Sequence, residues 1–67
     1  MFVRSAPLTV GAALALAEES LAAAGVDSPA AESYRLLGHV LGLGRTELLL
    51  RRADALTDSQ RFEFLSL

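Results

Sequence analysis

The sequence predicts an all-α fold, a small bundle of four or five short helices, and three observations support this. Alanine and leucine, the strongest apolar helix formers, supply 26 of the 67 residues. Isoleucine and tryptophan are absent and aromatic residues make up 6%, so residues that favour strands are scarce. Apolar residues also recur at helical spacing between capping signals. A chain of this length forms one domain, residues 1–67.

The first helix is expected to begin after Thr9, a favoured N-cap residue, and to end before Gly25, which suits a left-handed C′ position. Residues 1–8 show no periodicity, and Pro7 disfavours helix before it. The expected core stripe of this helix follows one apolar face and consists of Val10, Leu14, Ala17 and Leu21, widened by Ala13 and Ala24.

The second helix has the clearest start in the chain. Ser28 is a good N-cap residue, and Pro29 suits the first helical position because its missing N–H would have no partner there. Gly42 and Gly44 are expected to end the helix. Its core stripe is predicted to consist of Leu37, Val40 and Leu41, with Tyr34 and Leu36 beside them.

A third, short helix is predicted over Arg45–Arg51. Its three consecutive leucines, residues 48–50, cannot all face one direction, so at least one should meet a second packing surface. Arg51 and Arg52 lie near the end of this helix, where positive charge suits the helix dipole.

A fourth helix is predicted after a linker over residues 53–56, with a capping box formed by Thr57 and Gln60. Phe62 and Leu65, three residues apart, are expected to share its core face, with Phe64 off to the side. No C-cap signal precedes the last residue, which predicts that this helix is cut short.

Composition excludes several classes of function. The absence of cysteine removes disulfides, thiol catalysis and cysteine-based zinc sites. A formal net charge of −2 argues against a nucleic-acid partner, and the size argues against an enzyme complete in itself. Glu18 and Glu19 interrupt the apolar stretch, which is therefore too short and too charged to span a membrane. Domains this small are marginally stable alone.

Catalytic or metal-binding signals are weak. His39 is the single histidine, and the positions three and four residues away hold no second ligand, so no metal site is expected. Asp27-Ser28 at a helix start is similar to the site of acyl carrier proteins, whose serine carries phosphopantetheine, although Pro29 departs from that pattern. Arg4, the small apolar run after it and Ala15-Leu16-Ala17 imitate a secretory signal peptide, an alternative to the first helix.

Candidate binding residues are the arginines around the third helix. Arg45, Arg51 and Arg52 form the clearest positive cluster, and arginine is favoured at interfaces for its planar, bidentate geometry. The alternative is a local role, with Arg45 pairing within the domain and the other two serving the helix end. We expect these three residues to contact a protein partner.

Several motifs follow one another in a distinctive order and spacing. They are Leu21-Ala22-Ala23-Ala24-Gly25-Val26-Asp27, Ser28-Pro29 followed by Glu32, Leu36-Leu37 followed by His39-Val40, Gly42, Gly44-Arg45-Thr46, and Leu56-Thr57-Asp58 followed by Gln60. Together they resemble one family, the N-terminal helical domain of the HemK-type (PrmC) protein-(glutamine-N5) methyltransferases that modify peptide-chain release factors. The likeness covers nearly the whole chain from Thr9 onward. One departure is Tyr34, where the family pattern has a carboxylate.

The resemblance implies that this segment is a substrate-recognition domain and is not itself catalytic. The activity would belong to a following α/β domain that binds S-adenosylmethionine and methylates the glutamine of the release factor's Gly-Gly-Gln motif. The implied partners are class 1 release factors and the catalytic domain, with no cofactor in this segment, no nucleic acid, no membrane and a cytoplasmic location. The alternatives are a stand-alone helical interaction module, an acyl-carrier-like domain modified on Ser28, and a helix-turn-helix DNA binder. A DNA binder would need a basic recognition helix, and residues 29–41 contain one arginine, Arg35.

Overall fold

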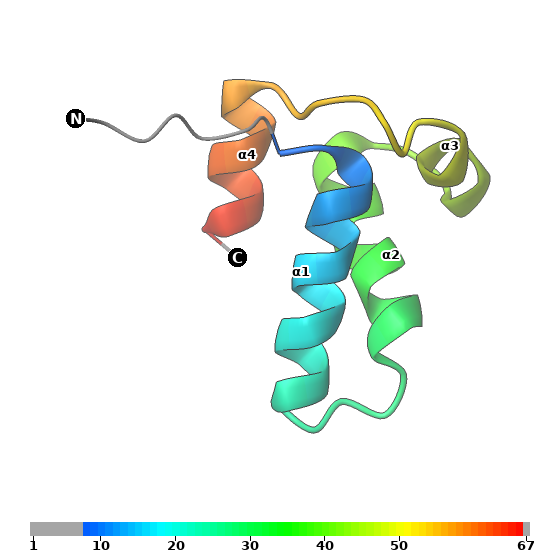
Figure 1. The fold of residues 1–67 in the computed structure, drawn as a ribbon, viewed down its shortest axis with the longest axis vertical. Helices are drawn as coiled ribbons and strands as arrows, with labels where there is room; N and C mark the ends of the chain where they lie inside the picture. Colours follow the sequence, from blue (N-terminus) through cyan, green and yellow to red (C-terminus); the bar gives the residue numbers. More distant parts are fainter. Residues whose placement is uncertain (1–7, 67) are drawn as a thin grey trace.

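The computed structural model describes residues 8–66, and this range folds into four α-helices with no strand beyond one isolated bridge. The helices are α1 (Val10–Ala23), α2 (Pro29–Leu41), α3 (Arg45–Leu50) and α4 (Asp58–Leu65). Helices α1 and α2 lie side by side, and α3 and α4 flank this pair on opposite sides, each in contact with α2 (Figure 1). The predicted all-α bundle is therefore confirmed.

Capping chemistry sets the ends of α1 and α4 where the sequence places them. The Thr9 hydroxyl oxygen accepts from the Ala12 N–H at 3.1 Å, and Gly25 adopts the left-handed conformation, with a φ of 84°. At α4, the Thr57 hydroxyl accepts from the Gln60 N–H at 3.1 Å, and the Gln60 Oε1 accepts from the Thr57 N–H at 2.9 Å. This reciprocal pair is the predicted capping box.

Helix α2 begins at Pro29 as predicted, but the Ser28 hydroxyl makes no capping hydrogen bond. The reason lies in the backbone: Ser28 has ψ 71°, whereas Thr9 and Thr57 have ψ 165° and 166°. The extended conformation places an N-cap oxygen over the first N–H groups, and Ser28 does not adopt it. Ser28 is thus the N-cap residue of α2, as predicted, but its hydroxyl does not cap the helix, while Gly42 ends the helix with φ 68° as expected.

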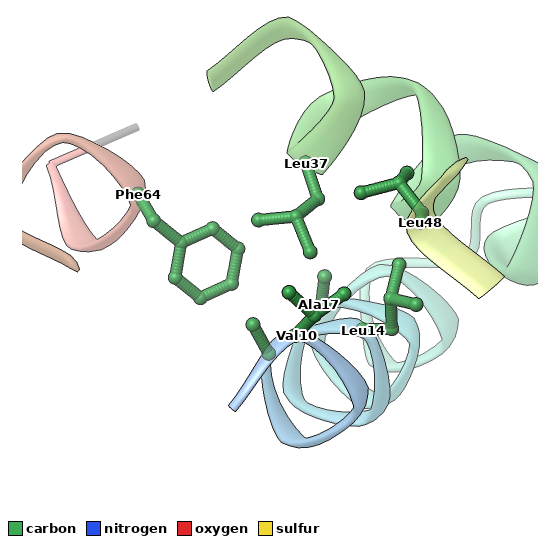
Figure 2. Packing of buried hydrophobic residues seen from close by; sticks show 7 residues of the cluster. Val10, Leu14, Ala17, Leu37, Leu48 and Phe64 are labelled. Carbon is green, nitrogen blue, oxygen red and sulfur yellow. The ribbon is translucent and has the colours of Figure 1, made fainter. Parts of the chain in front are cut away.

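The core forms around Leu37 of α2, which is fully buried. Figure 2 shows Leu37 pointing into the space between Phe64 of α4 and the apolar face of α1, with Leu48 of α3 on its other side. The α1 face is the predicted one, although Ala24 is exposed as the C-cap residue. The buried residues of α1 are Val10, Ala13, Leu14 and Ala17.

The prediction for the inward face of α4 is wrong. Phe64 is the buried residue, with 9% of its surface exposed, whereas Phe62 and Leu65 are 75% and 62% exposed. Two residues three apart share a face of a helix, but that spacing does not say which face turns inward. The rotation of α4 about its axis depends on tertiary contacts, which include those of the linker before it. This linker is held against the start of α1 by two hydrogen bonds, from the Val10 N–H to the Asp54 carbonyl and from the Leu56 N–H to the Leu8 carbonyl.

Expectations for residues 1–7 and Leu67 lie outside the described residues, so the cut end of the last helix stays a prediction. The stretch compared with a signal peptide is covered in part, and α1 runs unbroken across Ala17 and Glu18. In the described range 8–66, none of the helices has both the length and the apolar run needed to cross a bilayer.

Candidate partner-binding surface

Helix α3 and the turn after it carry the three arginines singled out in the sequence. The helix is six residues long and begins at Arg45, after the N-cap residue Gly44, whose N–H donates to the Glu47 carboxylate at 3.3 Å. Leu48 anchors it to the core and is fully buried. The other five residues of α3 are exposed.

Leu49 and Leu50 are exposed, with 44% and 82% of their surface accessible. The expectation that a second of the three leucines would meet another packing surface is therefore wrong for the described part of the chain. Three consecutive helical residues point about 100° apart, so burial of Leu48 turns the two that follow outward. The run of three leucines is itself the signal for this exposure, because three consecutive helical side chains cannot share one buried face.

Arg45 has a local partner. Its guanidinium carbon lies 4.7 Å from the centre of the Tyr34 ring of α2, within the range of a cation–π contact. Tyr34 is half-buried, so the contact fixes the first residue of α3 against α2. Tyr34 thus links α2 to the start of α3 in this chain.

Arg51 and Arg52 occupy the C-terminal end of α3. The Arg51 N–H donates to the carbonyl oxygens of Glu47 at 3.0 Å and Leu48 at 3.3 Å, which caps the helix. The Arg52 carbonyl accepts from the Gly11 N–H at 2.9 Å, which ties the turn to α1. Backbone atoms make these contacts, and both residues remain exposed.

The three arginines do not form one cluster. Arg45 and Arg51 stand six residues apart on α3, a rise of about 9 Å, and Arg45 is directed to Tyr34. Arg51 lines a small cleft of about 170 Å³ with Asp54 and Gln60, while the Arg52 side chain lies beside Gly11. We call the set Arg45, Leu49, Leu50, Arg51 and Arg52 the α3 surface.

Charge is segregated between the α3 surface and the rest of the domain. Residues 45–54 hold three arginines and two carboxylates, whereas the other described residues hold two arginines and six carboxylates. In the described range the single ion pair joins Arg35 and Glu32 at 3.6 Å, so no carboxylate lies within 4 Å of the three arginines of the α3 surface. The net charge is therefore +1 over residues 45–54 (three minus two) and −4 over the other described residues (two minus six).

A second apolar area lies between α1 and α4, and the sequence did not predict it. It is a groove of about 490 Å³ whose lining includes Leu16, Leu36 and Leu65. The exposed Phe62 belongs to the outer side of α4. Because Phe64 is the side chain of α4 that turns inward, Phe62 and Leu65 are left on the surface, and Leu65 lines the groove.

The remaining candidate residues lie apart from α3. His39 is exposed in the last turn of α2, and Ser28 is exposed in the loop between α1 and α2. No group of three histidine or carboxylate side chains in residues 8–66 is arranged to hold a metal ion.

Comparison with known proteins identifies the family. The family model described as the PrmC N-terminal domain matches residues 12–67, which span all four helices apart from the first two residues of α1. Searches of curated proteins and of solved structures returned no match. The match covers well over half of the chain and includes the whole α3 surface. The chain therefore belongs to the PrmC N-terminal domain family.

Proposed function

We propose that this chain is the substrate-recognition domain of a peptide-chain release factor methyltransferase, and that it holds the release factor in position for the catalytic domain. The observation that carries the proposal is the family match over residues 12–67. In this proposal, S-adenosylmethionine binds to the separate catalytic domain, which transfers the methyl group to the side-chain amide nitrogen of the Gly-Gly-Gln glutamine. The proposal places the protein in the cytoplasm.

The contribution of such a domain to the reaction is positional. Holding two reactants in the correct geometry removes much of the translational and rotational entropy cost of bringing them together. A recognition domain needs exposed residues that its own fold does not use, and the side chains of Leu49, Leu50, Arg51 and Arg52 are exposed. A folded scaffold that carries such residues on one side is suited to orient a large protein substrate.

The test is a titration of a purified class 1 release factor, labelled with a fluorophore, against the full protein. We expect saturable binding, with weaker or no binding to an unrelated acidic protein of similar size. Equal binding to both proteins, or no saturable binding to the release factor, would overturn the proposal.

The acyl-carrier alternative predicts a different result. Incubation with a phosphopantetheinyl transferase and coenzyme A would then add phosphopantetheine to the exposed Ser28, visible by mass spectrometry. Because the family match points away from carrier proteins, we expect no adduct.

A further inference from the structure

We propose that the α3 surface docks onto an acidic protein face that has an apolar hollow at its centre, with Leu50 as the side chain that enters the hollow. This inference rests on the proposed function and specifies it: the acidic, apolar face belongs to the release factor. It assigns the binding contact to the α3 surface and assigns no contact to the groove between α1 and α4.

The first argument is the exposure of two adjacent leucines. Leu50 has 82% of its surface accessible and Leu49 has 44%, while Leu48 is the leucine of α3 that is buried in the core. Single exposed apolar residues are common on protein surfaces, whereas larger apolar patches rimmed by polar residues mark sites of protein interaction. Since Leu50 contributes little to the packing of the domain, its apolar surface is available to a partner.

The second argument is charge. Arg51 and Arg52 border the two leucines directly, and Arg45 stands one turn before Leu49. None of the three has a carboxylate within 4 Å in the described part of the chain, so their positive charge is uncompensated by ion pairs. A partner with carboxylates around an apolar hollow would complement both features, because guanidinium groups bind carboxylates in bidentate geometry.

The segregation of charge also gives the contact an orientation. The rest of the described domain carries six carboxylates against two arginines and repels an acidic partner, whereas residues 45–54 carry a net charge of +1 and do not. Complementary fields of this kind steer the encounter and suppress wrong orientations. An acidic face would therefore approach the domain at α3.

A nucleic-acid backbone fits this surface less well. Residues 45–54 carry three arginines and two carboxylates, a net charge of +1, which is far from the clear basic excess of a nucleic-acid site. A phosphate backbone also offers little apolar surface against which Leu50 could be buried. The combination of exposed leucines and arginines favours a protein face.

The experiment compares two variants in the release-factor titration with the full protein. Leu50→Ser removes the proposed anchor, and Phe62→Ser removes an apolar side chain of similar exposure on α4, on the other side of the molecule (Figure 1). We expect Leu50→Ser to raise Kd at least about tenfold, because the burial of one leucine side chain is lost. Phe62→Ser should leave Kd within about twofold, and circular dichroism should show both variants folded.

The other possible outcomes would contradict either the assignment to α3 or the proposed function as well. Wild-type binding with no effect of Leu50→Ser would overturn this inference and leave the proposed function standing. Equal losses in both variants would overturn the assignment to α3. Leucine-dependent binding to vesicles of phosphatidylcholine and phosphatidylglycerol, with no binding to the release factor, would overturn the proposed function together with the inference.

Discussion

Gly38 of α2 and Leu43 of the next loop lie in direct backbone contact. The Leu43 N–H donates to the Gly38 carbonyl at 3.1 Å, and a Cβ atom placed on Gly38 would lie only 2.7 Å from the Leu43 carbonyl oxygen. Side-chain carbons do not approach a backbone oxygen so closely. The chain can therefore fold back from α2 into α3 at this point because residue 38 has no side chain.

Gly38→Ala is expected to destabilise the domain, although alanine is the better helix former. Relief of the contact requires the Leu43 backbone to shift, at a cost of about 1–3 kcal/mol, which outweighs the gain of up to about 1 kcal/mol in helix propensity. Urea unfolding followed by circular dichroism measures the change. The control is Ala15→Gly at an exposed position inside α1, where glycine should be worse by about 1 kcal/mol. A gain in stability from Gly38→Ala would show that the loop moves freely.

The helix limits of this fold could be predicted from sequence because they depend on local chemistry. Thr9, Pro29, Gly42 and Thr57 mark helix ends through caps, a fixed φ or a left-handed φ, and each of these acts within a few residues. The inward face of α4 could not be predicted in the same way. A helix of eight residues has few positions to define a stripe, so its rotation is decided by contacts distant in sequence.

Phe64→Ala should be severely destabilising and Phe62→Ala nearly neutral, the reverse of what their sequence spacing indicates. Removal of a buried phenylalanine side chain costs about 3–5 kcal/mol, whereas surface substitutions usually stay within about 0.5 kcal/mol. Thermal unfolding of the two variants measures the difference. Since a domain of this size could fail to fold after Phe64→Ala, Phe64→Leu provides a milder second variant that should still lower the melting temperature. Equal melting temperatures for Phe64→Leu and wild type would contradict the packing.

Thr57→Ala should cost about 1 kcal/mol, a typical loss for an N-cap hydroxyl, whereas Ser28→Ala should change the free energy of unfolding little. The Thr57 hydroxyl accepts a hydrogen bond from the Gln60 N–H, and the Ser28 hydroxyl caps nothing. Both residues are exposed and both are N-cap residues by sequence, so each controls for the other. Chemical denaturation would contradict the structure if Ser28→Ala were the more damaging change.

The contact between Arg45 and Tyr34 should contribute about 0.5–1 kcal/mol to stability, as expected for a cation–π pair near the surface. A double-mutant cycle with Arg45→Ala and Tyr34→Leu isolates this coupling from the packing lost with the tyrosine ring. Tyr34→Phe keeps the ring and should preserve most of the coupling with Arg45. Strictly additive effects of the two substitutions would show that the ring and the guanidinium group do not interact.

The candidate surface could be predicted only in part, because a sequence shows charge more readily than exposure. The sequence marks Arg51 and Arg52 by their charge, and the structure shows that both residues are exposed. The separation of Arg45 from them depends on its contact with Tyr34, eleven residues earlier. The run of three leucines does not show which one faces the core, and only the burial of Leu48 in the structure reveals that Leu50 is exposed.

Arg51→Ala combined with Arg52→Ala is expected to weaken release-factor binding about tenfold without unfolding the domain, because paired charges at protein interfaces contribute on this scale. Both side chains are exposed and in no ion pair of the described residues, so their loss should cost little stability. The matched control is Arg35→Ala with Arg61→Ala, which changes the net charge equally but leaves α3 intact. Titration of both double variants separates a local contact from a general charge effect. Equal weakening in both would show that net charge alone steers binding. Unchanged affinity of the Arg51→Ala, Arg52→Ala variant would show that these arginines lie outside the interface.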